Sequence, residues 1–244
     1  MPLKRDRVSE GIYVFTSGIY AEVTATVVFT EEGAVIVDTL PFPQETRHIR
    51  EFIDQRRAKP VYVINTHYHA DHVYGTYLFP EAEVIAHYRC RRIMERVAEE
   101  SLAQAKQQTP QLANVQIRYP QLLFNETLTL RLGGRTIELN YSPGHSRDLI
   151  TAYVQEDRLM IASDTVMPVP YIVGGDLDDM VESLTALKSK NIENLVQGHG
   201  EVLLRGEIEE TLDANIHYLR SIDRLVREYI ARGGPRNGVL QISI

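Results

Sequence analysis

The sequence is nearly free of cysteine. Cys90 is the single cysteine among 244 residues, so no intramolecular disulfide can form, which fits a reducing compartment. Arginines at positions 89, 91 and 92 surround it in the sequence and would lower the pKa of its thiol if they also surrounded it in space. We interpret Cys90 instead as a packing residue on a helix.

Long apolar stretches are absent as well. No run approaches the roughly 18 residues that a membrane-spanning helix needs. The first residues are basic, but the apolar segment and cleavage site of an export signal do not follow them. We therefore expect no membrane association and a cytoplasmic protein.

Positive charge is in the minority. The chain has 26 Lys and Arg against 33 Asp and Glu, a net charge of −7, which counts against nucleic acid as a partner. Four arginines (positions 89, 91, 92 and 96) share one predicted helix with three glutamates, so we interpret them as a mixed-charge solvated face. With 43% hydrophobic and 24% charged residues, the composition is that of a soluble globular enzyme.

Histidine is scarce overall but dense in one place. The chain has eight histidines, and three of them stand in the six-residue run His67-Tyr-His-Ala-Asp-His72. These are metal-ligand residue types, and a tetrahedral site also takes a ligand from elsewhere or a water. The apolar, β-branched residues 61–64 before the run predict a strand, which places the run in the loop at its carboxyl end. The spacing indicates two adjacent metal ions.

Ligand-type residues also follow four other predicted strands. Asp38 follows the apolar run 34–37, His145 comes after the alternating run 137–141, Asp164 after 159–162, and His199 after 195–196. Any one of these is weak evidence, because aspartate after a strand is usually turn chemistry, but with the histidine-rich loop they form one set. The candidate metal ligands are His67, His69, Asp71, His72, His145, Asp164 and His199.

At these residues the chain resembles the metallo-β-lactamase fold superfamily, from about residue 10 to about residue 205. The motifs occur in the superfamily's order: Val-Asp38-Thr, Thr-His67-Tyr-His69-Ala-Asp71-His72, Pro-Gly-His145-Ser, Ser-Asp164-Thr and Gly-His199-Gly. The resemblance implies an α+β fold, a four-layer αββα sandwich of two mixed β-sheets flanked by helices. We expect a single domain over residues 1–244 with a C-terminal amphipathic helix at about 205–232.

The resemblance also implies roles for the ligands. By similarity, the first metal would be bound by His67, His69 and His145, and the second by Asp71, His72 and His199, with Asp164 bridging both. Asp38 resembles the superfamily's structural acid, which supports the ligand loop by hydrogen bonds from behind. Two divalent ions are therefore expected, with Zn as the first expectation, although the oxygen ligand of an Asp bridge also suits Fe or Mn.

Such a pair of metals predicts hydrolysis. Two ions about 3.5 to 4 Å apart share a water whose pKa falls toward 7, so a bridging hydroxide exists at neutral pH. The expected substrate is a small acyl compound: a thioester, a lactone or a related ester. Asp71 keeps a free carboxylate oxygen and is the candidate for carrying a proton to the leaving group.

Two positions separate this chain from the lactamases proper. Those enzymes commonly have Cys or Ser where this chain has Asp164, whereas glyoxalase II and lactonase-type hydrolases have Asp. Met167 also stands where lactamases with the Cys ligand tend to carry a substrate-binding Lys. We therefore expect β-lactamase activity to be weak. Glyoxalase II has a larger helical C-terminal region for glutathione, so a thioesterase role stays open without a glutathione assignment.

Oxidoreductases of the same fold are the alternative. A persulfide dioxygenase-like enzyme uses a mononuclear iron site, and the complete second set with His72 and His199 favours the hydrolase over it. Diiron flavoproteins usually replace the second histidine of the loop by Glu, and this chain has His69. Hydrolysis therefore remains the leading prediction.

Several residues are candidates for the surroundings of the site. Residues 108–125 form either a flap over it or a plain surface connection, and we prefer the connection. Asp148 is expected to brace the loop of His145, and the isolated histidines at 48, 87 and 217 are expected to be structural. Tyrosines also pack readily outside pockets, but four stand near the ligands or in adjoining loops and are candidate substrate-binding residues: Tyr20, Tyr68, Tyr74 and Tyr171.

Overall fold

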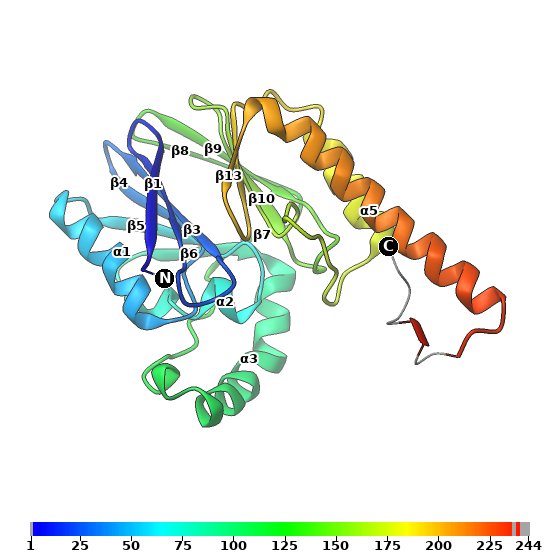
Figure 1. Ribbon diagram of the computed structural model, residues 1–244. Coiled ribbons are helices and arrows are strands. Elements are labelled where there is room, and N and C mark those ends of the chain that lie inside the picture. The colour runs from blue at the N-terminus through cyan, green and yellow to red at the C-terminus, as the bar shows by residue number, and fades with distance from the viewer. Residues whose placement is uncertain (1, 236–237, 240–244) are drawn as a thin grey trace.

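Two β-sheets lie face to face, and helices cover the outer side of each (Figure 1). The structure is a computed structural model, and it describes residues 2–235 and 238–239. The expected αββα sandwich of two mixed sheets is therefore confirmed.

The first sheet has seven strands in sequence order. Its first four strands pair antiparallel, and the pairs from β4 to β7 are parallel. Parallel neighbours need crossover connections, and here the crossovers carry α1, α2 and α3. The strands are β1 (Lys4–Ser9), β2 (Ile12–Thr16), β3 (Thr24–Thr30), β4 (Gly33–Val37), β5 (Pro60–Ile64), β6 (Glu83–His87) and β7 (Leu122–Phe124).

The second sheet has six strands in the order β13-β12-β11-β10-β9-β8. All its pairs are antiparallel except β11 with β12, which are joined through α4. The strands are β8 (Thr127–Leu132), β9 (Arg135–Tyr141), β10 (Ile150–Val154), β11 (Leu159–Ser163), β12 (Asn194–Gln197) and β13 (Val202–Leu204).

The core between the sheets comes from alternate residues of the inner strands. One face of the first sheet contributes Ile12, Val35 and Ile64, and the facing side of the second contributes Ile137 and Ile161, all in one buried cluster. Successive side chains of a strand point to opposite faces, so the intervening residues pack under helices. Both faces of β4, β10 and β11 are covered, and all their residues are buried.

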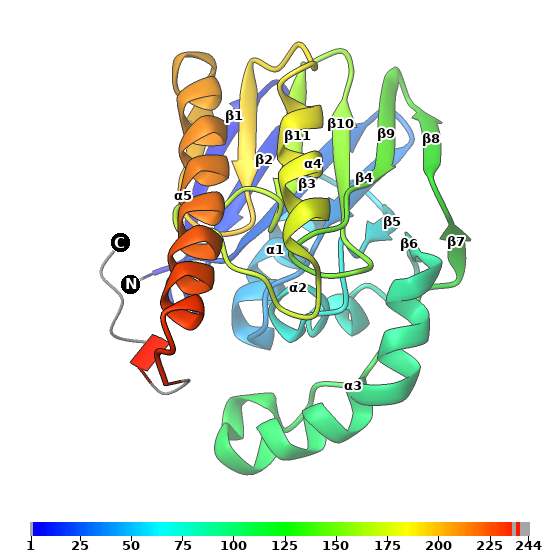
Figure 2. The same ribbon diagram turned by 90° about the vertical axis from the view of Figure 1, so that its right-hand side faces the viewer.

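Helices cover the two outer faces. Helix α1 (Pro43–Gln55) packs on the first sheet through Ile49, Phe52 and Ile53, and α3 (Tyr88–Gln108) contributes Met94 and other residues to a neighbouring cluster. Helices α4 (Leu177–Leu187) and α5 (Arg205–Ala231) lie together over the second sheet (Figure 2). The short helical segments are α2 (Ala70–Val73), η1 (Thr76–Leu78) and η2 (Pro110–Leu112).

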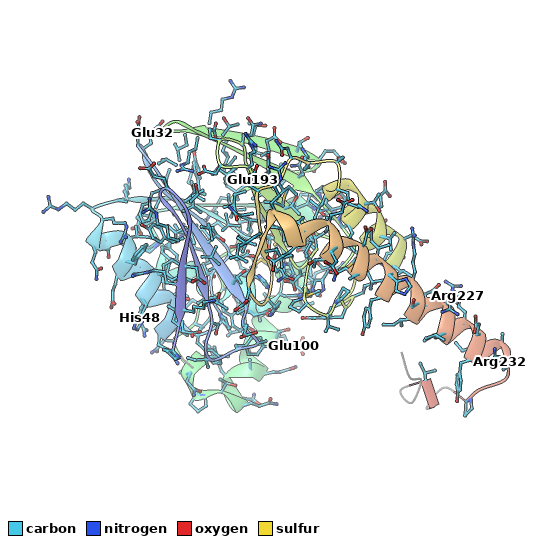
Figure 3. The ribbon with its side chains drawn as sticks, turned by 45° about the horizontal axis from the view of Figure 1, so that its top comes forward. Glu32, His48, Glu100, Glu193, Arg227 and Arg232 are labelled. Atoms are coloured by element: carbon cyan, nitrogen blue, oxygen red, sulfur yellow. The ribbon has the colours of Figure 1, made fainter. Side chains whose placement is uncertain are left out.

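Helix α5 continues past the sandwich. Its buried residues lie in the first half, from Ile208 to Leu219, and the end that carries Arg227 and Arg232 projects beyond the sheets (Figure 3). His48 lies on the exposed side of α1, and His217 is exposed, whereas His87 is buried and stacked on Tyr141. Within the described parts of the chain, no helix is both long and apolar enough to cross a membrane.

One strand differs from the pattern of the sequence, and one segment follows the preferred of its two predictions. All of the first four residues of strand β1 are charged and the strand lacks an apolar alternation, yet it pairs with β2 as an edge strand. Residues 108–125 do not form a free flap, since Leu112 and Val115 are buried and β7 extends the first sheet. Arg118 also donates hydrogen bonds to the carbonyls of Phe79 and Ala82. The segment is a packed connection.

Candidate metal centre

The histidine-rich loop follows β5 at its carboxyl end, next to β4. Pairing of β4 with β5 and of β5 with β6 holds the strand on both sides. Residues 70–73 then form the single turn α2, in which the backbone N–H groups of His72 and Val73 donate to the carbonyl of His69. This turn directs His67, His69 and His72 toward one another, with ring centroids 4.3 to 4.5 Å apart for His67 with each of the others.

The second sheet delivers three more side chains to the same place. His145 follows β9, Asp164 follows β11 and His199 follows β12. An isolated bridge between Val23 and His199 joins the last of these segments to the first sheet. All seven predicted ligands therefore lie together at one end of the sandwich, in two groups that each fit a metal ion.

The first group consists of His67, His69, His145 and Asp164. His69 Nδ1 lies 2.9 Å from His67 Nε2 and 3.0 Å from His145 Nε2. Asp164 Oδ2 lies 3.1 Å from His145 Nε2 and 3.6 Å from His67 Nε2. Three nitrogens and one oxygen thus face a common point.

The second group consists of Asp71, His72 and His199. Asp71 Oδ2 lies 3.8 Å from His72 Nε2 and 3.5 Å from His199 Nε2. The other carboxylate oxygen of Asp164, Oδ1, lies 3.3 Å from His72 Nε2 and 3.7 Å from His199 Nε2. Asp164 therefore presents one oxygen to each group.

Hydrogen bonds on the far side of each ring orient the histidines. His145 Nδ1 lies 2.8 Å from the carbonyl oxygen of Tyr171, and His199 Nδ1 lies 2.8 Å from that of Ala21. Because a carbonyl only accepts, Nδ1 carries the proton in both rings, and Nε2 keeps its lone pair toward the group. Such partners fix the tautomer and the orientation of a metal-binding imidazole.

Asp38 holds the ligand loop from behind. Its carboxylate accepts hydrogen bonds from the backbone N–H and the hydroxyl of Thr66 (2.8 and 2.7 Å), and it lies 2.9 Å from His72 Nδ1. The hydroxyl of Ser163 also donates to it at 3.3 Å and lies 2.8 Å from the Thr66 hydroxyl. One carboxylate thereby ties the ligand loop to the strand that precedes Asp164.

Two residues of the same network have a strained backbone. Asp38 and Ser163 have left-handed backbone conformations, with φ of 58° and 47°. Such conformations cost of order 1 kcal/mol or more in a residue other than glycine and persist where the surroundings impose them. Both residues stand at strand ends next to the ligands, so the fold supports this strain at the site.

The buried polar atoms fit a metal ion at the second group. His72 Nε2, His199 Nε2 and Asp164 Oδ1 are all buried, and none has a hydrogen-bond partner among the described residues. Buried polar atoms are normally paired, and here the unpaired atoms point to the centre of the second group. A divalent cation would satisfy all three.

Burial and charge set the protonation of the ligands. Burial lowers the pKa of His67 well below its ordinary value and that of His69 to about 4, with neighbouring histidines adding to the effect. Burial alone would raise the pKa of Asp164, but His72 and His67 hold it well below its usual range. Neutral imidazoles and an ionised carboxylate are the forms that bind metals.

The pKa values of His72 and His199 shift in the opposite direction. Burial opposes their charged forms, but Asp164 outweighs it and, with Asp71 and Asp38 beside His72, raises the pKa of both rings. The nearby carboxylates therefore favour the protonated, positively charged form of both rings. A divalent cation bound between these groups would supply that positive charge instead.

The tyrosines predicted to line a pocket lie in different environments. Tyr68 is half-buried with its ring against His69, and Tyr171 is 48% exposed with its ring edge-on to His145. Tyr20 is 46% exposed and packs against Phe42. Tyr74 is only 5% exposed and belongs to the cluster under α3, so it lies beneath the ligand loop rather than beside the opening.

Some residues of the site were not predicted. Thr66 and Ser163 each stand directly before a ligand, and that position was the one available signal of their role in binding Asp38. Glu45 of α1 accepts hydrogen bonds from Ser17 Oγ (2.6 Å) and Gly18 N (2.9 Å) and so fixes the start of the loop 17–22. Asp148 Oδ2 accepts from the N–H of Tyr68 at 2.8 Å, so it joins the loop of His145 to the histidine-rich loop.

The sequence profile described as the metallo-beta-lactamase superfamily matches residues 21–199, nearly three quarters of the chain and every ligand of both groups. The chain belongs to this superfamily. All the His and Asp residues of the two ligand groups lie within the matched region.

Named relatives in the superfamily include thioester hydrolases. A hydroxyacylglutathione hydrolase of Rhodopseudomonas palustris is 26% identical over 176 residues, 71% of this chain and 61% of that protein. The acyl-coenzyme A thioesterase MBLAC2 of Bos taurus is 23% identical over 192 residues, 74% of this chain and 66% of that protein. The chain thus spans about three fifths of the length of the curated relatives it matches.

A solved structure shows the same fold. The metallo-beta-lactamase from Pontibacter korlensis superposes with a TM-score of 0.74 at 18% identity, covering 90% of this chain and 99% of that one. At this identity the similarity establishes the architecture alone.

Proposed function

We propose that this protein is a dinuclear metal-dependent hydrolase that cleaves a small acyl substrate, with thioesters as the favoured class. The observation that carries the proposal is the position of Asp164, whose two carboxylate oxygens face two separate ligand groups. A carboxylate that presents one oxygen to each of two adjacent ligand groups favours two neighbouring ions over a single isolated one.

The residues divide naturally between two ions. His67, His69 and His145 would hold the first, and Asp71, His72 and His199 the second, with Asp164 shared. Bound there, divalent ions would supply Lewis-acid activation of water and of the acyl carbonyl. Zn suits the imidazole-rich first group, and the additional carboxylate oxygens also suit Fe or Mn.

Asp71 is placed to move a proton. Its side chain is 17% exposed, whereas those of His67, His72 and Asp164 are at most 2% exposed. Its Oδ2 points to the second group, so the carboxylate contacts both the ligands and the solvent. A carboxylate in that position can accept a proton from water and pass it to the leaving thiol or alcohol.

The surroundings favour an acyl substrate over a β-lactam. Met167 is 1% exposed, so at the position where lactamases carry a lysine this chain has a buried apolar residue and no charge to receive a substrate carboxylate. One relative is named an acyl-coenzyme A thioesterase and another a hydroxyacylglutathione hydrolase, and these names support thioesters within the class. Lactones and related esters are the next candidates.

Hydrolysis assays on metal-quantified protein test the proposal. We expect turnover of thioesters by the reconstituted protein, loss of turnover on chelation and recovery on return of the metal. Asp71→Asn protein that has been loaded to full metal content should show a kcat about a hundredfold lower, in line with general acid–base catalysis. An Asp71→Asn protein that keeps both its metals and its kcat would remove the proton-transfer role. Oxygen uptake with a persulfide, without hydrolysis of any ester, would instead identify the oxidoreductase alternative.

A further inference from the structure

A cleft beside the metal centre gathers four arginines. It has a volume of about 700 Å³, within the range of small-molecule sites. One wall is the first half of α3, and the other is formed by the segment after β9 and the start of α4. The arginines that line it are Arg89, Arg92, Arg96 and Arg147.

Helical periodicity explains the arginine-rich wall. Positions 89, 92 and 96 are spaced by three and four residues, so their side chains share one face of α3. The buried residues of the same helix, including Cys90 and Met94, lie on another face against the sheet. Because the buried face of α3 packs against the protein, the face with these three arginines lines the cleft.

Most of this positive charge is not neutralised. Arg91 pairs with Glu95 at 2.7 Å, as the mixed-charge pattern predicts, but neither belongs to the cleft. In the part of the chain that the structure describes, the side chains of Arg92, Arg96 and Arg147 form no ion pair or hydrogen bond. Asp176 and Asp179 also line the cleft, but the Asp176 carboxylate accepts the N–H groups of residues 178 and 179. The lining of the cleft therefore carries four guanidinium groups and two carboxylates.

Arg89 is held in place by neutral partners. Its Nε donates to the hydroxyl of Tyr88 at 3.1 Å, and its Nη1 donates to the hydroxyl of Tyr141 and to the carbonyl of Arg147. These acceptors fix the guanidinium without cancelling its charge. A pre-oriented guanidinium loses less entropy when it binds an anion.

The cleft and the metal centre share one segment of chain. His145 belongs to the first ligand group, and Arg147 lies two residues later in the cleft. The N–H of Asp176 donates to the carbonyl of Gly144 at 2.9 Å, which holds the start of α4 against this segment. A molecule in the cleft therefore lies next to the loop that presents His145.

We propose that this cleft binds the phosphate groups of the thiol half of the substrate, as in a nucleotide-bearing thioester of the coenzyme A type. The inference rests on the proposed thioester hydrolysis. Guanidinium groups recognise phosphate oxygens through paired, charge-assisted hydrogen bonds, and a site with four of them suits a group with several phosphates. The net charge of −7 opposes a nucleic acid as the source of those phosphates.

A binding titration tests the cleft independently of catalysis. The probe is adenosine 3′,5′-bisphosphate, titrated by calorimetry into the metal-loaded protein. The double variant Arg92→Ala/Arg96→Ala should raise its Kd at least tenfold, because two charge-assisted contacts are lost. Arg47→Ala/Arg220→Ala removes the same charge from exposed positions of α1 and α5 and should leave Kd within twofold. Absence of binding to the unsubstituted protein, or equal effects of the two variants, would overturn the proposal.

Kinetics show whether the phosphates belong to the substrate. One acyl group is offered on coenzyme A and on N-acetylcysteamine, a short thiol without phosphate. Arg92→Ala/Arg96→Ala should raise KM about tenfold for the coenzyme A ester and leave KM for the short thioester unchanged. If KM for the two thioesters changes by the same factor, the cleft takes a free phosphate compound. That result would overturn the assignment of the cleft to the substrate. If neither thioester reacts, the proposed function fails, while the titration still decides whether phosphate binds.

Discussion

The floor of the site and its rim are built in opposite ways. On the floor, the ligands His67, His72, His145 and Asp164 are at most 1% exposed, and hydrogen bonds from three strand ends hold them. The rim consists of the loops 17–22 and 168–175, which carry the exposed apolar side chains Ile19, Tyr20, Val169, Tyr171 and Val173. Among the residues that the structure describes, ten large hydrophobic side chains have substantial exposure, and half of them lie on these two loops.

This difference separates the tasks of the two regions. Each floor residue depends on partners that lie far away in the sequence, so a substitution there disturbs several groups together. Rim side chains have few partners in the protein and are free to contact a substrate. The floor should therefore decide whether a reaction occurs, and the rim should decide which acyl group is accepted. Four substitutions test this division.

Asp164→Ala should have the largest effect. Its carboxylate is the group shared by the two ligand sets, so its removal should reduce binding of both metals and lower kcat/KM on the order of a thousandfold or more. Metal analysis and thioester kinetics measure the two effects. Val169→Ala on the rim is the control and should keep its full metal content. Retention of both metals by Asp164→Ala would break the distinction between floor and rim.

Gly198→Ala should act on the floor through sterics alone. A Cβ at this position would lie 1.8 Å from Asp164 Oδ1 and 2.7 Å from the backbone nitrogen of Asp164. Accommodating it must displace the shared carboxylate, which should lower metal affinity and destabilise the fold by about 2 kcal/mol. Gly206→Ala, where a Cβ would meet nothing within 4 Å, is the matched control. Equal melting temperatures and metal contents for the two variants would contradict the close packing described here.

Asp38→Asn should weaken the floor without removing a ligand. Asparagine also tolerates the left-handed backbone at this position, but it cannot accept with two charged oxygens from Thr66 and His72. Loss of such a partner typically lowers metal affinity 10- to 100-fold. Competition with a chromophoric chelator measures this change, and Glu31→Gln on an exposed turn serves as the control. Affinity unchanged within twofold would show that Asp38 does not orient the ligands.

Tyr171→Phe on the rim should have the smallest effect. Burial, together with Asp164 and Asp71, raises the pKa of Tyr171 to about 12, so its phenol stays protonated throughout the working pH range. Removing the hydroxyl should therefore leave the pH profile of kcat unchanged and alter KM by less than about tenfold. If the unsubstituted protein showed a change of kcat at alkaline pH that Tyr171→Phe lacks, Tyr171 would titrate during turnover.

The sequence predicts the floor far better than the rim. The run from His67 to His72 is contiguous, and one buried strand before it is enough to place it. Asp164 and His199 could be placed because each follows an apolar strand, and strand ends gather at one edge of a sheet. Thr66 and Ser163 escaped prediction because their common partner, Asp38, comes from a strand that is distant in the sequence.

Other features depend on contacts that local patterns do not encode. Strand β1 is an edge strand whose polar residues pair with β2 through the backbone. Tyr74 stands beside the ligands in the sequence, but the turn of α2 carries it into the cluster under α3. The arginine cleft appears only when α3 meets the segment after β9. In each case tertiary packing decides the environment of the side chain.

Metal stoichiometry tests the central claim most directly. Protein reconstituted with Zn and freed of excess ions by gel filtration is analysed for metal per chain by mass spectrometry, together with His199→Ala. Two facing ligand groups that share Asp164 predict two equivalents in the unsubstituted protein and about one in His199→Ala. A single equivalent in the unsubstituted protein, unchanged by His199→Ala, would contradict the account.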